Sequence, residues 1–534
     1  MNKKKITGFR IVISILLLIA GKLSAQFAEQ PPFKISIEPV YNTTINQGFH
    51  SFAFAQSGSK WLLIGGRTNG LHGLNSNDPF PQADANNFIT VIDTVGWQIF
   101  QSSLSNLPYA VADPLRSTNM QYVQKEEYLY MIGGYGRDSI LNKFVTFPVV
   151  SRLLVDSVIE AVINQTPVDS FIKQVTDTNL RICGGEMHYY TKKFQLMFGH
   201  DFNGRYANPF VPIYTQYYRS QIKRFEIFEN AGNIEVVDYT ELTDTNNFHR
   251  RDLNVVPMIQ PNGDHALMAH AGVFQKQRDF PYFEPIYMDT SGYTVLPYTQ
   301  VLNHYTCAYL PIFDTVSKKM HTVFFGGMSF NDFVPTSNSI VEDTLVPFIS
   351  DVTCFTVKPG NICEEAVMPV QLPGLLGTNA KFIPNRNISW YVNDVMDFNS
   401  ITGKTLAGYI LGGIRADLPN EGSSVANDTI YRIYIEYDST VSIKTIGEEF
   451  AFFDVFPNPA TNKLSIQFQL KEESEIQIGM IDVNGKVISG FTKMKYSKGK
   501  VQKSIDVSEV PNGIYVIKCN SKKTSINRKV IVMH

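Results

Sequence analysis

An apolar run that ends in or near glycine returns six times along the chain, roughly every 70 residues. The copies are WLLIGG (61–66), YLYMIGG (128–134), FQLMFGH (194–200), HALMAHAG (265–272), HTVFFGG (321–327) and AGYILGG (407–413). Each run follows a short strand and a tight turn, and two more strand-like segments come after it. A repeated unit of four antiparallel strands predicts an array of small sheets arranged as a ring.

The glycines in this pattern have a physical reason. A strand that leaves a crowded centre must let its backbone approach the neighbouring sheet, and glycine has no Cβ to obstruct that approach. We therefore expect glycine where neighbouring sheets meet.

The first copy resembles a blade of a kelch-type β-propeller. The matching residues are Gly65, Gly66, Asp93, Trp97, Pro108 and Arg116. The third and fourth copies depart from the pattern, because His200 and His270 stand where the family has a glycine, and the tryptophan is absent after the first copy. The resemblance implies an all-β fold, with a six-bladed kelch-like propeller over residues 26–446.

A ring of sheets needs a strand that joins its two ends, since an unpaired sheet edge is prone to aggregation. Residues 33–40 precede the first copy and resemble a fourth strand, so they are one candidate for completing the last sheet. Residues 441–446 compete for that place.

The first 25 residues are predicted to be a secretory signal peptide. A basic opening precedes the apolar stretch 11–20, and small residues stand before the expected cleavage point. The stretch is too short to span a membrane, and we expect no transmembrane segment elsewhere.

After residue 446 the chain changes character, and short strands with Asn-Gly turns predict a small β-sandwich over 447–534. This region resembles the type A sorting domain of the type IX secretion system. The residues proposed as the sorting signal are Pro457, Asn458, Pro459, Gly485, Gly513, Tyr515 and Lys529. The resemblance implies passage through the periplasm, contact with the type IX secretion machinery, and a protein that is secreted or held at the outer-membrane surface.

The net charge bears on whether the protein binds nucleic acid, and the cysteine count limits the number of disulfides. The chain carries 47 basic and 49 acidic residues, a formal net charge of -2, so we expect no nucleic-acid partner. Five cysteines in an exported protein allow at most two disulfides. Cys354 and Cys363 flank a predicted hairpin turn and are the candidate pair, because cross-strand residues of a hairpin can lie within disulfide reach.

A ring of sheets sorts its connections onto two faces. Turns within the first hairpin, and between third and fourth strands, are expected to be short, whereas connections after the glycines and between sheets are long. Long loops on a rigid scaffold commonly carry function. The candidate binding residues on this long-loop face are Arg67, Asn69, Arg137, Asp201, Arg205, Tyr206 and Arg415. Arginine and aromatic groups suit carboxylates and sugars, although solvated or bracing charges are the alternative.

Catalytic motifs are missing from the sequence: it has no HExxH or GxSxG, and GKT at 403–405 lacks the upstream glycine of a phosphate loop. A copper site would need two His and two Tyr side chains to converge, and His50, His304 and Tyr305 are the candidates for it. Histidines on inner strands more often fill the centre of such a fold, so we expect no metal and no cofactor. The leading hypothesis is a non-catalytic glycan- or protein-binding module. The alternatives are a kelch-like sugar epimerase or mutarotase that acts on an acidic sugar, and a purely structural surface protein.

Overall fold

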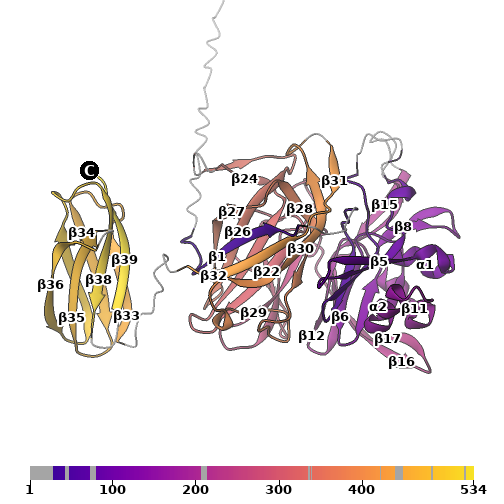
Figure 1. Cartoon of the computed structure of the whole chain (residues 1–534), viewed down its shortest axis with the longest axis horizontal. Helices are drawn as coiled ribbons and strands as arrows, with labels where there is room; N and C mark the ends of the chain where they lie inside the picture. Colours follow the sequence, from indigo (N-terminus) through magenta and orange to yellow (C-terminus); the bar gives the residue numbers. More distant parts are fainter. Residues whose placement is uncertain are drawn as a thin grey trace, which may run out of the picture.

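The computed structural model of the chain describes residues 28–41, 47–72, 78, 80–205, 213–334, 337, 339–420, 423–438, 449–482, 485–521 and 525–534. Most described residues lie in β-strands, so the prediction of an all-β protein is confirmed (Figure 1). The predicted signal peptide (1–25), residues 441–446 and Tyr206 lie outside the described residues. Within the described part, neither α-helix has the length and apolarity needed to cross a membrane.

Six sheets each contain four antiparallel strands, which follow the order of the chain in the first five sheets once inserted strands are set aside. The first three sheets are β2 (Ala53–Ser57), β3 (Lys60–Ile64), β4 (Phe88–Asp93) and β5 (Gln98–Ser103); β6 (Gln121–Lys125), β7 (Tyr128–Ile132), β10 (Val149–Leu154) and β11 (Ile172–Thr176); and β12 (Glu186–Tyr190), β13 (Lys193–Met197), β16 (Gln221–Asn230) and β17 (Asn233–Thr243). The last three are β18 (Asn254–Ile259), β19 (His265–His270), β20 (Ile286–Met288) and β21 (Tyr293–Val295); β22 (Ala308–Asp314), β23 (Lys319–Met328), β26 (Phe348–Lys358) and β27 (Ile362–Gln371); and β28 (Leu375–Pro384), β30 (Thr405–Ala416), β32 (Tyr431–Tyr437) and β1 (Phe33–Pro39).

The sixth sheet is completed by the first strand of the chain. β1 pairs antiparallel with β32, from Phe33 opposite Tyr437 to Pro39 opposite Tyr431. Of the two segments predicted to compete for this place, the N-terminal one therefore occupies it. The two ends of the repeated region are held in a single sheet.

Inserted elements lengthen several connections. Three connections after a second strand fold back as two-stranded sheets, namely β8 (Tyr135–Asp138) with β9 (Lys143–Thr146), β14 (His200–Arg205) with β15 (Ile213–Tyr218), and β24 (Asn331–Val334) with β25 (Ser339–Glu342). The remaining short elements are α1 (Tyr109–Leu115), α2 (Val155–Ile163), β29 (Met396–Asp397), β31 (Ser424–Ala426), η1 (Gln82–Asp84), η2 (Leu104–Asn106), η3 (Asp169–Phe171), η4 (Thr178–Leu180) and η5 (Phe398–Ser400).

Two of these insertions contradict the expectation of short turns on one face. Helix α2 stands between the third and fourth strands of the second sheet. In the sixth sheet, residues 385–404 separate β28 from β30 and include β29, which pairs parallel with β22 of the fifth sheet.

The six sheets meet in a closed cycle of backbone hydrogen bonds. In the first five sheets the residue two positions before the first strand, and in the sixth sheet Asn379 within β28, donates its N–H to the carbonyl of the corresponding residue of the preceding sheet. The donor and acceptor pairs are Asn119 and Ser51 (3.1 Å), Gly184 and Asn119 (2.9 Å), Asp252 and Gly184 (2.7 Å), Thr306 and Asp252 (3.3 Å), Asn379 and Thr306 (2.8 Å), and Ser51 and Asn379 (3.4 Å). The cycle returns to its first residue, and we call these six residues the backbone ring.

Glycine at the end of a second strand permits this close approach. Gly133 has a φ of +70°, and a Cβ at that position would lie 1.9 Å from the carbonyl oxygen of Ile182, just before the third sheet. Gly412 of the sixth sheet stands in the same relation to Phe49, just before the first sheet, at 2.3 Å. The expectation that glycine marks the contacts between sheets is confirmed at both positions.

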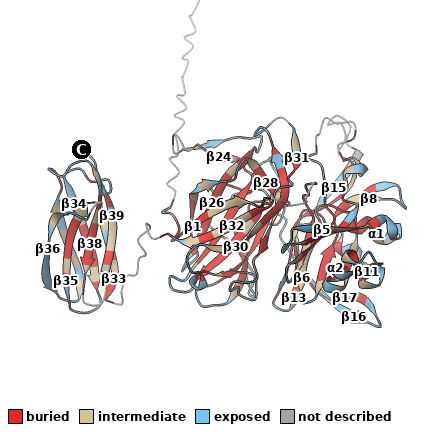
Figure 2. Ribbon diagram, viewed as in Figure 1, coloured by how far each residue is buried: buried red, intermediate tan, exposed pale blue. Residues whose placement is uncertain are grey.

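Buried apolar clusters lie between neighbouring sheets. Six clusters each combine residues of two consecutive sheets, and one of them joins the sixth sheet back to the first. Figure 2 shows the buried residues along the strands of these sheets. In that cluster Trp61 of β3 packs edge-on against Tyr409 of β30, with ring centroids 5.0 Å apart. Trp97, which carried the kelch resemblance, lies 5.7 Å from both rings.

The proposed disulfide between Cys354 and Cys363 is not formed, and both thiols are free. The predicted hairpin exists, but its register places Cys354 opposite Ala366 and Cys363 opposite Val357. Because side chains alternate between the two faces of a strand, this register puts the two sulfur atoms on opposite faces of the sheet.

The C-terminal strands (yellow in Figure 1) form two further sheets. One contains β33 (Phe450–Phe456), β34 (Lys463–Leu470) and β37 (Gly499–Asp506), and the other β36 (Val487–Tyr496), β35 (Ser474–Asp482), β38 (Gly513–Asn520) and β39 (Ser525–Val532). Apolar residues of both sheets share one buried core, among them Phe453 and Ile466 from the first and Ile478 and Ile517 from the second.

We predict that Gly133→Ala lowers the free energy of unfolding by more than about 3 kcal/mol, because the new Cβ meets the Ile182 carbonyl in addition to the left-handed backbone. Gly403→Ala is the matched control, since Gly403 has a φ of +59° but no atom within 4 Å of its virtual Cβ. It should cost only about 1 kcal/mol. Denaturant unfolding monitored by tryptophan fluorescence measures both, and equal costs would contradict the close-approach argument.

Candidate functional site

Three cavities are lined by residues of the first strands or of the segments that lead into them. The smallest, about 20 Å³, is lined by all six residues of the backbone ring and has room for about one water molecule. A cavity of about 90 Å³, here the loop-end cavity, shares Ser51, Asn119, Asp252 and Asn379 with the ring. A cavity of about 440 Å³, here the strand-end cavity, is lined by residues from all six first strands.

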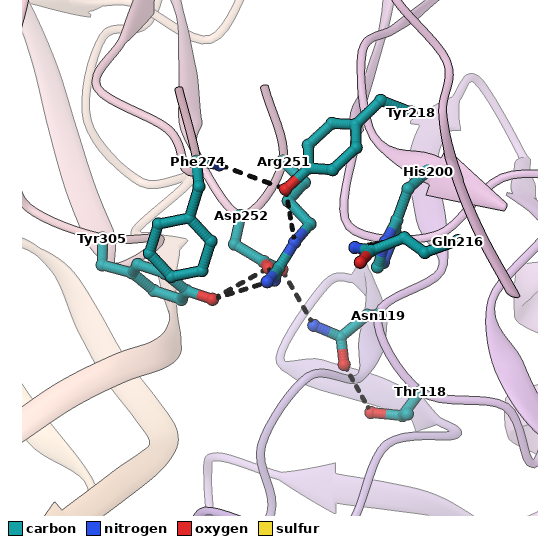
Figure 3. A network of polar contacts seen from close by, with 9 residues as sticks. All are labelled: Thr118, Asn119, His200, Gln216, Tyr218, Arg251, Asp252, Phe274 and Tyr305. Atoms are coloured by element: carbon teal, nitrogen blue, oxygen red, sulfur yellow. Dashed lines mark hydrogen bonds and ion pairs between the residues drawn. The ribbon is translucent and has the colours of Figure 1, made fainter. Parts of the chain in front are cut away.

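A network of polar side chains lies at the loop-end cavity (Figure 3). The Asp252 carboxylate forms an ion pair with Arg251 and accepts a hydrogen bond from the Tyr305 hydroxyl at 2.8 Å. Arg251 Nε donates to the hydroxyl of Tyr218 at 3.2 Å, and the Asn119 amide lies 3.4 Å from Asp252. These side chains come from the second, fourth and fifth sheets and from the inserted strand β15, so the fold assembles them from distant parts of the chain.

A second arginine, Arg67, lines the same cavity. It follows β3 and is held in place by its Nε hydrogen bond to Asn69 Oδ1 (3.0 Å) and its Nη2 hydrogen bond to the Pro81 carbonyl (2.9 Å). Its guanidinium carbon lies 4.1 Å from the centroid of the Phe80 ring. Burial lowers the pKa of Arg67 to about 10, so the side chain is still cationic at neutral pH.

Three histidines of this cavity are uncharged at neutral pH. Burial, helped by the charge of Arg67, lowers the pKa of His50 to about 3. Burial and Arg251 lower the pKa of His72 to about 4 and that of His200 well below its usual value. The charges that line the cavity are Arg67 and Arg251 against Asp252, while Asp84 lies behind Arg67 at 3.9 Å. The two guanidinium groups on the cavity wall make it attractive to an anion.

Two histidines of the cavity are held by neighbouring polar side chains. His200 Nδ1 lies 2.6 Å from the amide of Gln216, and His50 Nδ1 lies 2.9 Å from Ser51 Oγ. His50 Nε2 is buried and makes no hydrogen bond to a described residue, although the Asn69 backbone lies near enough to the His50 ring to oppose the lowering of its pKa. A buried polar atom without a hydrogen bond is costly, which points to a water or ligand atom beside it.

Of the residues predicted to bind ligand, Arg67 lines the loop-end cavity and Asn69 positions it. Asp201 lies close by in β14 but forms an ion pair with Arg219 at 2.8 Å. Arg415 is an exposed residue of β30.

The predicted arginines of the two inserted hairpins lie at a separate, open groove. Arg137 of β8 and Arg205 of β14 both line it. Arg137 Nη2 donates to Asn142 at 2.5 Å, whereas Arg205 is 3.4 Å from Asp78 and lies 4.4 Å above the Phe144 ring. The six candidates that the structure describes therefore do not line one cavity.

The polar network of Arg251, Asp252 and Tyr218 was missed by the sequence prediction. Arg251 and Asp252 lie in the short segment that leads into β18, where nothing in the local sequence distinguishes them. His304, considered for a metal, is a buried bracing residue whose Nδ1 and Nε2 lie 2.8 Å from the Gly326 carbonyl and 2.6 Å from Thr353 Oγ1. Among the described residues no group of three or more His, Cys, Asp or Glu side chains is placed to hold a metal ion.

The strand-end cavity presents charges of both signs. Glu186 of β12 and Lys381 of β28 line it, and the Lys381 ammonium lies 5.3 Å from the centroid of the Tyr122 ring. Burial raises the pKa of Glu186 to about 7 although Lys381 opposes that shift. Part of residues 385–404 borders the same cavity, including Trp390 and Asn393.

In the C-terminal sheets, the proposed sorting residues surround the end of the last strand. The Asn458 amide nitrogen donates to the Lys529 carbonyl at 3.2 Å, and its Oδ1 accepts from the Ile531 N–H at 2.8 Å. The adjoining Ala460 forms a parallel bridge with Val532. Segments from both ends of this region are thus fastened together.

The other proposed sorting residues have simpler positions. Gly485 has a φ of +83° in the turn that follows Asp482. The buried Tyr515 donates its hydroxyl to the Pro511 carbonyl at 2.8 Å, Gly513 pairs with Val532, and Lys529 is exposed on β39. Pro457 and Pro459 flank Asn458 at the end of β33.

Residues 454–533 match the family described as a secretion system C-terminal sorting domain. The match supports the resemblance to the type IX sorting domain drawn from the sequence, and it indicates export of the protein to the cell surface or the medium. The contacts of Asn458 and Val532 lie within this matched region and hold its two ends together. No curated protein matches the chain.

We predict that Glu186→Gln stabilises the protein at pH 8 by about 3 kcal/mol and leaves its stability unchanged near pH 4. The pKa of Glu186 is raised from 4.5 to about 7 in the folded protein. The free energy of unfolding is therefore highest below pH 4.5, where Glu186 is protonated, and it falls as the pH rises through 7. Glutamine removes that loss because it never ionises.

The exposed Glu226 of β16 supplies the control variant Glu226→Gln, which should show no such pH-dependent gain. Thermal unfolding of both variants across pH 4–8 measures the difference. An equal response of the two variants would show that Glu186 is not desolvated.

Proposed function

We propose that this protein is an exported six-bladed, kelch-like propeller that binds a carboxylate-bearing sugar of a glycan in its loop-end cavity. The six four-stranded sheets, the closed backbone ring and the six inter-sheet clusters support the propeller arrangement. The pairing of β1 with β32 supports a ring that is fastened by its first strand.

The sorting domain supports the export route. It indicates transport by the type IX secretion system, and the predicted signal peptide supplies the first step across the inner membrane. Attachment to the outer-membrane surface and release to the medium both agree with this route.

The proposed ligand class rests on one observation, the presence of Arg67 and Arg251 on one small cavity whose histidines are neutral. A guanidinium recognises a carboxylate through charge-assisted hydrogen bonds, which are stronger than neutral ones. The volume of about 90 Å³ suits the acidic group of a sugar rather than a folded protein segment. The rest of the glycan would lie along the surrounding loops.

The protonation states of His50 and Cys183, which line the loop-end cavity, favour binding over catalysis. An epimerase or mutarotase acting on an acidic sugar needs a base with a pKa near the working pH. His50 has a pKa of about 3 and is a weak base. Burial raises the pKa of the Cys183 thiol to about 12, so it stays protonated and is a poor nucleophile.

We predict that the mature protein binds uronic acids and sialic acid, and binds the neutral parent sugars at least tenfold more weakly. Arg251→Gln should weaken binding of the acids at least tenfold and leave the neutral sugars unaffected. Asp252→Asn should strengthen binding of the acids, because it removes the negative charge that opposes them. Titration calorimetry measures each dissociation constant, and one-dimensional NMR of the same samples reports anomer exchange.

Arg386→Gln is the matched control, because Arg386 lines the strand-end cavity and pairs there with Asp394. It should leave acid binding unchanged. Equal loss in Arg251→Gln and Arg386→Gln, or no preference for acids, would reject the proposed site. Accelerated anomer exchange would favour the epimerase or mutarotase alternative. The absence of both binding and anomer exchange with every sugar would favour a protein ligand or a structural role.

We also predict that deletion of residues 450–534 traps the protein in the periplasm, because the sorting domain is lost. Fractionation and immunoblotting of the native host measure the distribution. Full-length Arg251→Gln is the control and should be exported normally. Unchanged delivery of the truncated chain to the surface or medium would contradict the assigned role of the sorting domain.

A further inference from the structure

The strand-end cavity is a second site, distinct from the one proposed for acidic sugars. The two share no lining residue, and the backbone ring stands between them. At about 440 Å³ the strand-end cavity is also much the larger.

Two opposite charges of the first strands line this cavity without forming an ion pair with each other. Glu126, Arg386 and Asp394 also line it, and Arg386 is paired with Asp394. Glu186 belongs to the third sheet and Lys381 to the sixth, which are three sheets apart along the backbone ring. Among the described residues neither side chain forms an ion pair or hydrogen bond. Within that part of the chain, Lys381 has only the face of the Tyr122 ring as a partner. Partly buried charges that lack an ion-pair partner are costly, and the protein would be more stable if they met or were replaced by apolar groups.

The walls between these charges are largely aromatic. Phe54, Tyr122, Tyr309, Phe382 and Trp390 all line the cavity. The polar atoms of two of them are engaged in the protein, since the Tyr309 hydroxyl donates to the Val255 carbonyl at 3.0 Å and Trp390 Nε1 donates to the Asn385 carbonyl at 2.9 Å. Their rings are left to contact an apolar group.

The insertion at residues 385–404 borders this cavity and reaches across it. It leaves the sixth sheet, and the Asn393 amide donates to the Met258 carbonyl of the fourth sheet at 3.2 Å. An ion pair between Arg386 and Asp394, at 2.6 Å, ties the two arms of the insertion together. The corresponding connections of the other five sheets are tight turns, so this end of the structure carries an addition that the sheets themselves do not need.

We infer that the strand-end cavity binds a free amino acid with an aromatic or large apolar side chain. The ammonium group of the ligand lies toward Glu186, its carboxylate toward Lys381, and its side chain against the aromatic walls. A zwitterion supplies a partner to each protein charge at once, which a singly charged molecule of the same size does not.

The test uses L-phenylalanine with two analogues that each lack one charge, N-acetyl-L-phenylalanine and L-phenylalaninamide. Calorimetric titration of the full mature chain should show binding of phenylalanine, with both analogues at least tenfold weaker. Because these measurements need only the wild-type protein, they do not depend on whether a variant folds.

Two variants then assign each charge. Glu186→Gln should weaken phenylalanine binding at least tenfold and abolish the preference over the N-acetyl analogue, while it keeps the preference over the amide. Lys381→Met should do the reverse. Arg251→Gln, at the loop-end cavity, should leave phenylalanine binding unchanged.

The inference is overturned if phenylalanine does not bind at millimolar concentration, or if both analogues bind as tightly as phenylalanine. It is also overturned if the two variants lower the affinity for all three probes equally, which would mean that they disturb the cavity rather than remove a charge contact. A protein that does not bind acidic sugars could still bind phenylalanine, so these experiments test the two proposed sites independently.

Discussion

The backbone ring is the constraint on which the rest of the structure depends. Six N–H groups and six carbonyls, one of each from every sheet, satisfy each other in a closed cycle. These groups are largely removed from water, so each would be costly if left unpaired. The cycle forces the first strands to converge, and the convergence in turn sets where the cavities lie. A ring with another number of members would displace every side chain that lines them.

Convergence also limits which residues can stand at the centre. Ser51, Asn119, Gly184, Asp252 and Asn379 all have positive φ, a conformation that costs most side chains about 1 kcal/mol or more. Small residues and Asn or Asp tolerate it best, and they occupy these positions. The same requirement that fits them to the ring leaves Asn119 and Asp252 with polar side chains at the loop-end cavity. Asn119 and Asp252 therefore serve both the backbone ring, through their main chain, and the loop-end cavity, through their side chains.

Much of the framework could be predicted from the sequence, because it depends on local patterns. Apolar runs, glycines and turn residues specify strands and their order, and residues 33–40 carried enough alternation to be considered as the closing strand. The polar network could not be predicted, since Arg251 and Tyr218 become neighbours only after an inserted hairpin folds back over the centre. The sequence prediction grouped Arg137 and Arg205 with Arg67 because all three lie on long loops. Loop length can indicate the face on which a residue lies, but it does not indicate which cavity the residue lines. The register of the β26–β27 hairpin, which separates Cys354 from Cys363, likewise depends on packing that single-sequence patterns do not record.

The pairing of β1 with β32 has a consequence for how the chain matures. The earliest strand of the repeated region cannot find its partner until nearly all of that region has emerged, and closing so long a loop is entropically unfavourable and slow. Until then, β32 and β1 each present an unsatisfied edge. For a protein that carries an export domain, this late pairing leaves the sixth sheet incomplete until most of the chain has emerged.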